Sequence, residues 1–171
     1  MPQPTPATLW LTLAQGATNN HLTEPQVTSM PSPATILLVE DNPDDESLTV
    51  RALRTGTTAN IEVARDGQTA LDYLFDDAKS MPRLVLLDLN LPDVDGLEVL
   101  QRIREHERTG LTPVVILTGF NAPIDVAAAY RHGANSYVCK PVDFDQFAEV
   151  IHQLGLYWLA VNEPPPNARE Q

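Results

Sequence analysis

Short apolar runs alternate with more polar segments along the chain from residue 35 onward. Each run has the length of a buried strand, and several of the segments between them begin with a helix-capping residue. The predicted strands are residues 35–39, 60–64, 83–88, 113–118 and 136–139, and the predicted helices are residues 44–55, 67–77, 95–107, 124–131 and 143–158. Strict alternation of strands and helices is typical of βαβ units, so we expect a parallel sheet.

Turn and capping residues support this division. Asn42-Pro43, Asp66-Gly67, Asp95-Gly96 and Asp143 each stand where a predicted helix begins, as residues with helix-capping side chains do. The handedness of parallel crossovers leaves few topologies for such a chain. We therefore predict an α/β fold, the flavodoxin-like (βα)5 doubly wound parallel sheet with strand order 2-1-3-4-5.

The last predicted helix is apolar on more than one face. One set of residues recurs at three- and four-residue steps and is expected to face the sheet: Phe144, Phe147, Ile151, Leu154 and Trp158. Leu156, Tyr157 and Leu159 add apolar positions near the end of the helix. Two interpretations stay open at this point, because the helix either only covers the sheet or also forms a subunit or partner interface.

Both ends of the chain are rich in proline. Residues 1–33 combine proline with Thr, Gln and Asn, a composition that buries too little apolar surface to offset its ordering entropy. We predict a disordered extension at residues 1–33, one domain at residues 34–160 and a disordered tail at residues 161–171. Met30 offers an alternative translation start, which would make residues 1–29 an upstream artefact.

Composition narrows the class of protein. The 171 residues carry 23 Asp and Glu against 11 Lys and Arg, a net charge of −12, which argues against a nucleic-acid partner because phosphates are bound by Lys and Arg clusters. The apolar runs are too short to span a membrane. A secretory signal requires a positively charged beginning, but no Lys or Arg precedes Arg51. We therefore expect a cytoplasmic protein.

Cys139 is the only cysteine, which excludes an internal disulfide. Its position in an apolar run predicts a buried side chain.

Polar residues stand where four of the predicted strands stop. Glu40 and Asp41 follow the first strand, Asp88 ends the third, Thr118 ends the fourth and Lys140 follows the fifth. Ligands of open α/β sheets bind outside the carboxyl ends of the strands. We therefore expect these five residues to converge on one site.

These side chains suit a magnesium ion and a phosphoryl group. Mg²⁺ prefers oxygen ligands and needs only one or two carboxylates beside a phosphate, and an Asp carboxylate can accept a phosphoryl group. The Lys140 ammonium can neutralise phosphoryl oxygens, and the Thr118 hydroxyl can donate a hydrogen bond to one. Gly119 leaves space beside Thr118, and Pro141 fixes the turn after Lys140. Each residue alone also has an ordinary structural explanation, so the prediction depends on the whole set.

Five short motifs carry these residues. They are Leu-Val-Glu-Asp-Asn-Pro at 38–43, Leu-Leu-Asp-Leu-Asn-Leu-Pro at 86–92, Asp-Gly at 95–96, Ile-Leu-Thr-Gly at 116–119 and Lys-Pro at 140–141. With these motifs, residues 34–155 resemble the receiver domain of two-component response regulators. The resemblance implies that Asp88 is the phosphoacceptor. It also implies that Asp41, Asp88 and the backbone carbonyl of Asn90 bind Mg²⁺, with Glu40 assisting through a metal-bound water.

The same resemblance assigns the remaining residues of the site. Thr118 and Lys140 would contact the phosphoryl group, and Tyr137 would turn inward with Thr118 on phosphorylation. This movement would change the surface formed by the fourth helix, fifth strand and fifth helix. Asn90 and Phe120 flank the path of attacking water, and we predict that Phe120 shields the acyl phosphate.

A narrower resemblance comes from Tyr73-Leu74-Phe75, the loop at 81–83 and the ending Leu156-Tyr157-Trp158-Leu159. These segments are similar to the small stand-alone receivers that partner bacterial and cyanobacterial phytochrome histidine kinases. The similarity implies an upstream sensor histidine kinase and a homodimer, with Leu156, Tyr157, Trp158 and Leu159 as candidate interface residues. The signal would then reach an unknown downstream protein by contact, without an output domain. The proline-rich extension is a departure from this subfamily.

Three alternatives stay open. A haloacid-dehalogenase-like phosphohydrolase also uses a strand-end Asp, but it needs a second Asp where this chain has Asn90, which cannot transfer a proton. A flavodoxin-like nucleotide binder needs a Gly-rich or Ser/Thr-rich phosphate loop, and the first strand leads into acidic residues instead. A receiver-shaped binding module that takes no phosphate would not need the complete set of site residues. We therefore predict a signalling protein that catalyses only its own phosphorylation and slow dephosphorylation.

Overall fold

The computed structural model describes residues 33–165. In this range strands and helices alternate: β1 Thr35–Val39, α2 Pro43–Gly56, β2 Asn60–Ala64, α3 Gly67–Phe75, β3 Leu84–Leu87, α4 Gly96–Glu105, β4 Val114–Thr118, α5 Pro123–Arg131, β5 Ser136–Cys139 and α6 Phe144–Leu156, followed by a π-helical segment η1, Tyr157–Val161. The strands form one parallel sheet in the order β2-β1-β3-β4-β5. The predicted fold class and strand order are confirmed.

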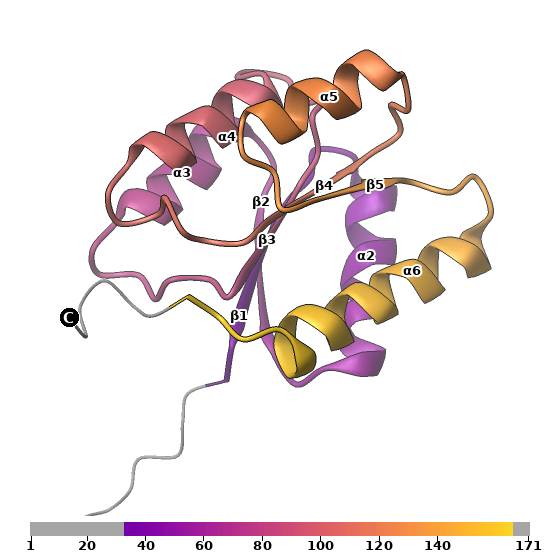
Figure 1. Cartoon of the computed structure of the whole chain (residues 1–171). Coiled ribbons are helices and arrows are strands. Elements are labelled where there is room, and N and C mark those ends of the chain that lie inside the picture. Colours follow the sequence, from indigo (N-terminus) through magenta and orange to yellow (C-terminus); the bar gives the residue numbers. More distant parts are fainter. Residues whose placement is uncertain (1–32, 166–171) are drawn as a thin grey trace, which may run out of the picture. The chain divides into compact units, whose positions relative to one another are not determined.

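The sheet lies between two layers of helices, with α3, α4 and α5 on one face and α2 and α6 on the other (Figure 1). Successive strand residues point to opposite faces. Leu37 and Leu87 therefore pack in the core beside α3 and α4, whereas Ile36 and Leu86 pack beside α2 and α6. Because both faces are covered, the central strands are apolar throughout, and polar side chains are confined to the strand ends.

The predicted capping residues start their helices. The Asn42 side chain accepts a hydrogen bond from the backbone N–H of Asp44 at 2.9 Å, and Asp66, Asp95 and Asp143 cap α3, α4 and α6 in the same manner. Each cap satisfies a backbone N–H that has no partner within its helix. Local sequence therefore determines where these helices begin.

The apolar stripe predicted for α6 is only partly buried. Phe147 and Ile151 lie in the core, and Leu154 packs against it. Phe144 is 43% exposed and lies beneath the guanidinium of Arg51, 5.4 Å from the ring centroid. The prediction that Phe144 faces the sheet is wrong, because the first residue of the helix lies beyond the edge of the core.

The candidate interface residues at the C-terminal end separate into two groups. Trp158 is 9% exposed and belongs to the core cluster beside α2 and α6, so its inclusion in a contact surface was wrong. Leu156 and Tyr157 are exposed, and Leu159 is partly exposed. Trp158 continues the sheet-facing stripe of α6, as its spacing predicted, while Leu156 and Tyr157 stay accessible.

Cys139 is exposed, which contradicts the predicted buried side chain. It ends β5, an edge strand that has a neighbour on one side only.

The predicted extension and tail lie mostly outside the described range, which leaves out residues 1–32, including Met30, and residues 166–171. Segment η1 ends at Val161, one residue past the predicted domain boundary. Across residues 33–165, no helix is long and apolar enough to cross a membrane.

Candidate functional site

The carboxyl ends of the strands bring the predicted site residues together. The N–H of Glu40 donates to a carbonyl of β2 at 2.9 Å, and the N–H of Asp88 donates to a carbonyl of β1 at 3.0 Å. The N–H of Lys140 donates to the carbonyl of Thr118 at 2.7 Å. These bonds continue the strand pairing by one residue, so Glu40, Asp88 and Lys140 leave the sheet at the same edge.

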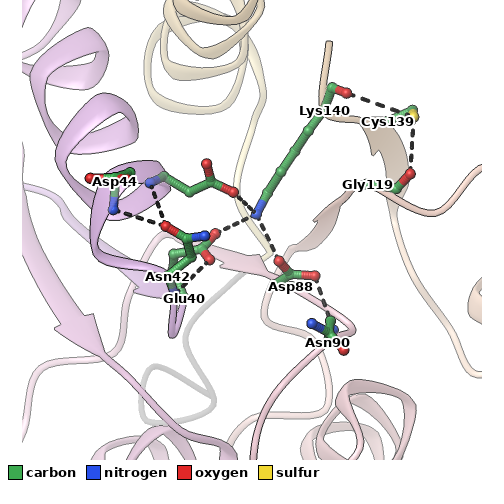
Figure 2. Close-up of polar contacts among 9 residues, drawn as sticks. Glu40, Asn42, Asp44, Asp88, Asn90, Gly119, Cys139 and Lys140 are labelled. Atoms are coloured by element: carbon green, nitrogen blue, oxygen red, sulfur yellow. Dashed lines mark hydrogen bonds and ion pairs between the residues drawn. The ribbon is translucent and has the colours of Figure 1, made fainter. Parts of the chain in front are cut away.

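The Lys140 ammonium lies at the centre of this edge. Its Nζ donates to Glu40 Oε2 at 2.6 Å, to Asp88 Oδ2 at 2.7 Å and to Asp45 Oδ2 at 2.7 Å. Figure 2 shows the lysine side chain reaching from β5 to Glu40 and Asp88 at the neighbouring strand ends. The side chains of Glu40, Asp88 and Lys140 are 1%, 8% and 11% exposed. The structure therefore joins three of the predicted site residues in one buried charge cluster.

Burial and charge pairing oppose each other in this cluster. Burial raises the pKa of Glu40 above its usual range, although the neighbouring Lys140 ammonium acts in the other direction. For Lys140, burial alone would lower the pKa, but hydrogen bonds to Asp45, Asp88 and Glu40 outweigh it, and the pKa lies above its usual range. The lysine is thus a permanent cation at neutral pH.

Thr118 has a buried hydroxyl with no hydrogen-bond partner. Its side chain is 0% exposed, at the end of β4 beside the Asp88 strand. A Cβ atom added at the following Gly119 would have nothing within 4 Å. Buried hydroxyls without partners are uncommon and require an explanation. A phosphoryl oxygen at this edge would provide the missing acceptor.

Comparison with known proteins decides the family. The response regulator receiver domain model matches residues 36–152. The chain belongs to the response regulator receiver family. The charge cluster around Lys140 therefore lies in a receiver domain, at the carboxyl edge of the sheet where the strand ends predicted a site.

The relatives of this receiver include regulators of different processes. It is 45% identical over 137 residues to the probable methanogenesis regulatory protein FilR2 of Methanothrix harundinacea, covering 78% of this chain and 88% of FilR2. The Mn²⁺-bound response regulator Rcp1, a Synechocystis protein, is 34% identical with a TM-score of 0.74, covering 78% of this chain and 100% of that structure. The bacteriophytochrome response regulator AtBRR is 44% identical with a TM-score of 0.61, with the same two coverages.

The donor set of the receiver fits a hard divalent cation. Glu40, Asp41 and Asp88 offer carboxylate oxygens, and Asn90 offers its backbone carbonyl, which are ligands of the kind that Mg²⁺ prefers. Among residues 33–165 no group of three Asp, Glu, His or Cys side chains is already arranged to hold a metal. The positive charge between Glu40 and Asp88 is that of Lys140.

Backbone hydrogen bonds orient the two buried carboxylates of the receiver. Asp88 Oδ1 accepts from the N–H of Asn90 at 3.0 Å, and Glu40 Oε1 accepts from the N–H of Asn42 at 3.1 Å. The loop after Asp88 also passes very close to α4. A Cβ atom at Gly96 would lie 2.5 Å from the carbonyl oxygen of Asp88, so only glycine fits there.

Tyr137 and Phe120 lie together at the side of the receiver's site. The Tyr137 hydroxyl donates to the Phe120 carbonyl at 2.9 Å, and the Tyr137 ring is partly buried against the core. The Phe120 side chain is 49% exposed. Pro141 follows Lys140 through a trans peptide bond, and residues 33–165 contain no cis bond.

Two acidic residues of the receiver make contacts that the sequence did not predict. Asp45 is not among the residues predicted for the site, yet its carboxylate accepts a hydrogen bond from Lys140 at 2.7 Å. Asp93 lies in the loop after β3, and its carboxylate accepts from the N–H groups of Gly67 at 2.8 Å and Gln68 at 3.0 Å. Burial tends to raise the pKa of Asp93, but these bonds outweigh it and lower the pKa. Both contacts span distant segments, so spacing along the chain could not reveal them.

Proposed function

We propose that this receiver accepts a phosphoryl group on Asp88 from the phosphohistidine of a sensor histidine kinase, with Mg²⁺ as cofactor. The observation that carries the proposal is the 2.7 Å hydrogen bond between the Lys140 ammonium and the buried carboxylate of Asp88. The ammonium offsets part of the desolvation cost of the buried carboxylate, and an Asp carboxylate oxygen can attack phosphorus. The unpaired Thr118 hydroxyl on the next strand supports the same conclusion.

The proposed reaction is an in-line displacement at phosphorus. One carboxylate oxygen of Asp88 forms a bond to phosphorus while the phosphorus–nitrogen bond of the phosphohistidine breaks, and the departing imidazole nitrogen takes up a proton from solvent. The Lys140 ammonium and the Thr118 hydroxyl then pair with phosphoryl oxygens. Their role is to stabilise the negative charge on the transferred group.

The metal would be held by the acidic edge of the sheet. Asp41, Asp88 and the carbonyl of Asn90 would bind Mg²⁺, with Glu40 assisting through a water molecule. When bound, the ion supplies positive charge to the phosphoryl oxygens. The relative Rcp1 has a Mn²⁺-bound structure, which supports binding of a divalent metal.

The proposed kinase is of the phytochrome type. Support comes from AtBRR, a bacteriophytochrome response regulator with 44% identity to this chain. FilR2, a probable methanogenesis regulatory protein, is 45% identical to this chain, so the histidine kinases tested should include ones that are not phytochromes. The match covers the solved structures of Rcp1 and AtBRR over their whole length, which supports signalling by a single receiver.

The proposed output surface comprises α5, β5 and α6. Ile124 and Tyr130 on α5 are 73% and 51% exposed, and Tyr157 after α6 is 50% exposed. Large exposed apolar side chains favour protein contact. We propose that a second copy of the receiver binds at this face, with Leu156, Tyr157 and Leu159 at its margin, and that the phosphorylation state changes its affinity for a downstream protein.

Phosphate would leave Asp88 slowly in this proposal. Asn90 stands two residues past Asp88, where a phosphohydrolase of the haloacid-dehalogenase type needs a second Asp as acid and base, and an amide cannot transfer that proton. The acyl phosphate would therefore persist as a signal, and the protein would not act as an enzyme with turnover.

Phosphotransfer with the full chain tests this function. Candidate kinases labelled on histidine with radioactive phosphate are mixed with the wild type, Asp88→Asn or Asp44→Asn, with Mg²⁺ or with EDTA. Transfer to the wild type and to Asp44→Asn, but not to Asp88→Asn or in EDTA, is expected. Asp44 is the control because it is an exposed carboxylate close in sequence to the site. Label that survives Asp88→Asn would overturn the proposal.

A further inference from the structure

Asp45 is a carboxylate outside the predicted site that contacts its central cation. It lies in the first turn of α2, and its Oδ2 accepts a hydrogen bond of 2.7 Å from Lys140 Nζ, 95 positions away in the chain. The adjacent Asp44 is exposed to solvent. The start of α2 therefore directs one of two neighbouring carboxylates into the site.

The hydrogen-bond capacity of Lys140 limits what else it can bind. An ammonium has three N–H donors, and Glu40, Asp45 and Asp88 each accept one of them. A phosphoryl oxygen can therefore pair with Lys140 only if one of the three carboxylates gives way.

Asp45 is the partner that can leave at the lowest cost. Glu40 and Asp88 are 1% and 8% exposed, and each has a second oxygen that accepts a backbone N–H. The Asp45 side chain is 34% exposed. Its carboxylate can turn into water and be solvated there, whereas a buried carboxylate that loses its cation pays a large desolvation penalty.

We propose that Asp45 competes with the phosphoryl group for the Lys140 ammonium and thereby slows phosphorylation of the receiver. This inference rests on the proposed function of Asp88. Asp45 is a positioning residue that acts through Lys140: it holds the ammonium among the carboxylates until a phosphoryl oxygen displaces it. Its negative charge also repels an incoming anionic phosphodonor.

The test compares the full chain with Asp45→Asn, Asp45→Glu and Asp44→Asn. Phosphoramidate serves as a small phosphodonor at saturating Mg²⁺, and the initial rate of Asp88 phosphorylation is measured. Asp45→Asn should react about fivefold faster, the size expected for loss of one partly exposed ion pair. Asp45→Glu keeps the charge and Asp44→Asn removes an equal charge one residue away, so both should stay within about twofold of the wild type.

Binding of beryllofluoride provides a readout without a chemical step. This mimic of a phosphoryl group should bind Asp45→Asn more tightly than the wild type by a similar factor, with both controls unchanged. A wild type that labels on Asp88 while Asp45→Asn shows no gain in rate or affinity would overturn the role of Asp45 and leave the proposed function standing. An equal gain in Asp44→Asn would overturn it too. Absence of labelling in the wild type with every phosphodonor would overturn the proposed function and this inference together.

Discussion

The hydroxyl of Tyr137 donates a hydrogen bond of 2.9 Å to the backbone carbonyl oxygen of Phe120. The bond joins β5, which leads to Lys140, to the segment that follows Thr118 at the end of β4. Burial, together with the negative charge of Asp125, raises the pKa of Tyr137, so its hydroxyl is a donor at neutral pH. Tyr137, which is predicted to turn inward on phosphorylation, is thus hydrogen-bonded to Phe120, which is predicted to shield the acyl phosphate.

Tyr137→Phe removes this bond and keeps the ring. We expect the free energy of unfolding to fall by about 1 kcal/mol, the usual contribution of one such hydrogen bond. Urea denaturation measures the change. Tyr130→Phe is the control, because Tyr130 is 51% exposed on α5. An equal loss in the two variants would show that the bond to Phe120 contributes nothing specific.

Phe120→Ala should shorten the lifetime of the acyl phosphate on Asp88. If the aromatic side chain keeps water from the phosphorus, its removal should speed loss of phosphate by about threefold to tenfold, which corresponds to roughly 1 kcal/mol of barrier. Decay of radioactive label from the isolated phosphorylated protein gives the rate. Ile124→Ala removes another exposed apolar side chain nearby in sequence and should leave the rate unchanged. Equal or slower decay of Phe120→Ala would reject shielding.

Glu40→Gln should increase the free energy of unfolding at pH 7 when EDTA removes divalent metal. Burial raises the pKa of Glu40 above its ordinary value of 4.5, so the folded state favours the protonated carboxyl. The contribution of Glu40 to stability is therefore fully present below pH 4.5 and is lost as the pH rises through the raised pKa. Glutamine stays neutral at every pH.

The stability difference between Glu40→Gln and the wild type should therefore grow above pH 4.5 and then level off. Urea denaturation over a series of pH values measures it. A variant less stable than the wild type at pH 7 would show that the bond between Glu40 and Lys140 outweighs the cost of burial.

Trp158→Ala should reduce stability, whereas Tyr157→Ala should reduce self-association, although the two residues are adjacent. Trp158 is 9% exposed in the core, so its truncation should cost about 3–5 kcal/mol of stability. Tyr157 is 50% exposed, so its truncation should leave stability nearly unchanged and weaken self-association. Thermal unfolding and sedimentation velocity distinguish the two effects. Unaltered self-association of Tyr157→Ala would exclude this residue from the proposed dimer.

Local sequence was sufficient to predict the fold and the meeting of Glu40, Asp88 and Lys140 at one edge of the sheet. Buried parallel strands are apolar throughout, so the runs that end at Val39, Leu87 and Thr118 could be read as strands directly. Capping residues such as Asn42 and Asp143 marked helix starts because their side chains satisfy backbone groups a few positions away. Once the strands were parallel, their carboxyl ends had to meet, which placed Asp88 and Lys140 at one edge.

Tertiary structure alone decided which groups touch and which are exposed. The bond from Lys140 to Asp45 depends on how α2 packs beside the sheet, and no spacing rule links two residues 95 positions apart. Cys139 lies in an apolar run that predicts burial, but its position on an edge strand exposes it. Periodicity identifies the elements because their hydrogen bonds are local or regular, whereas contacts between elements depend on packing geometry in three dimensions.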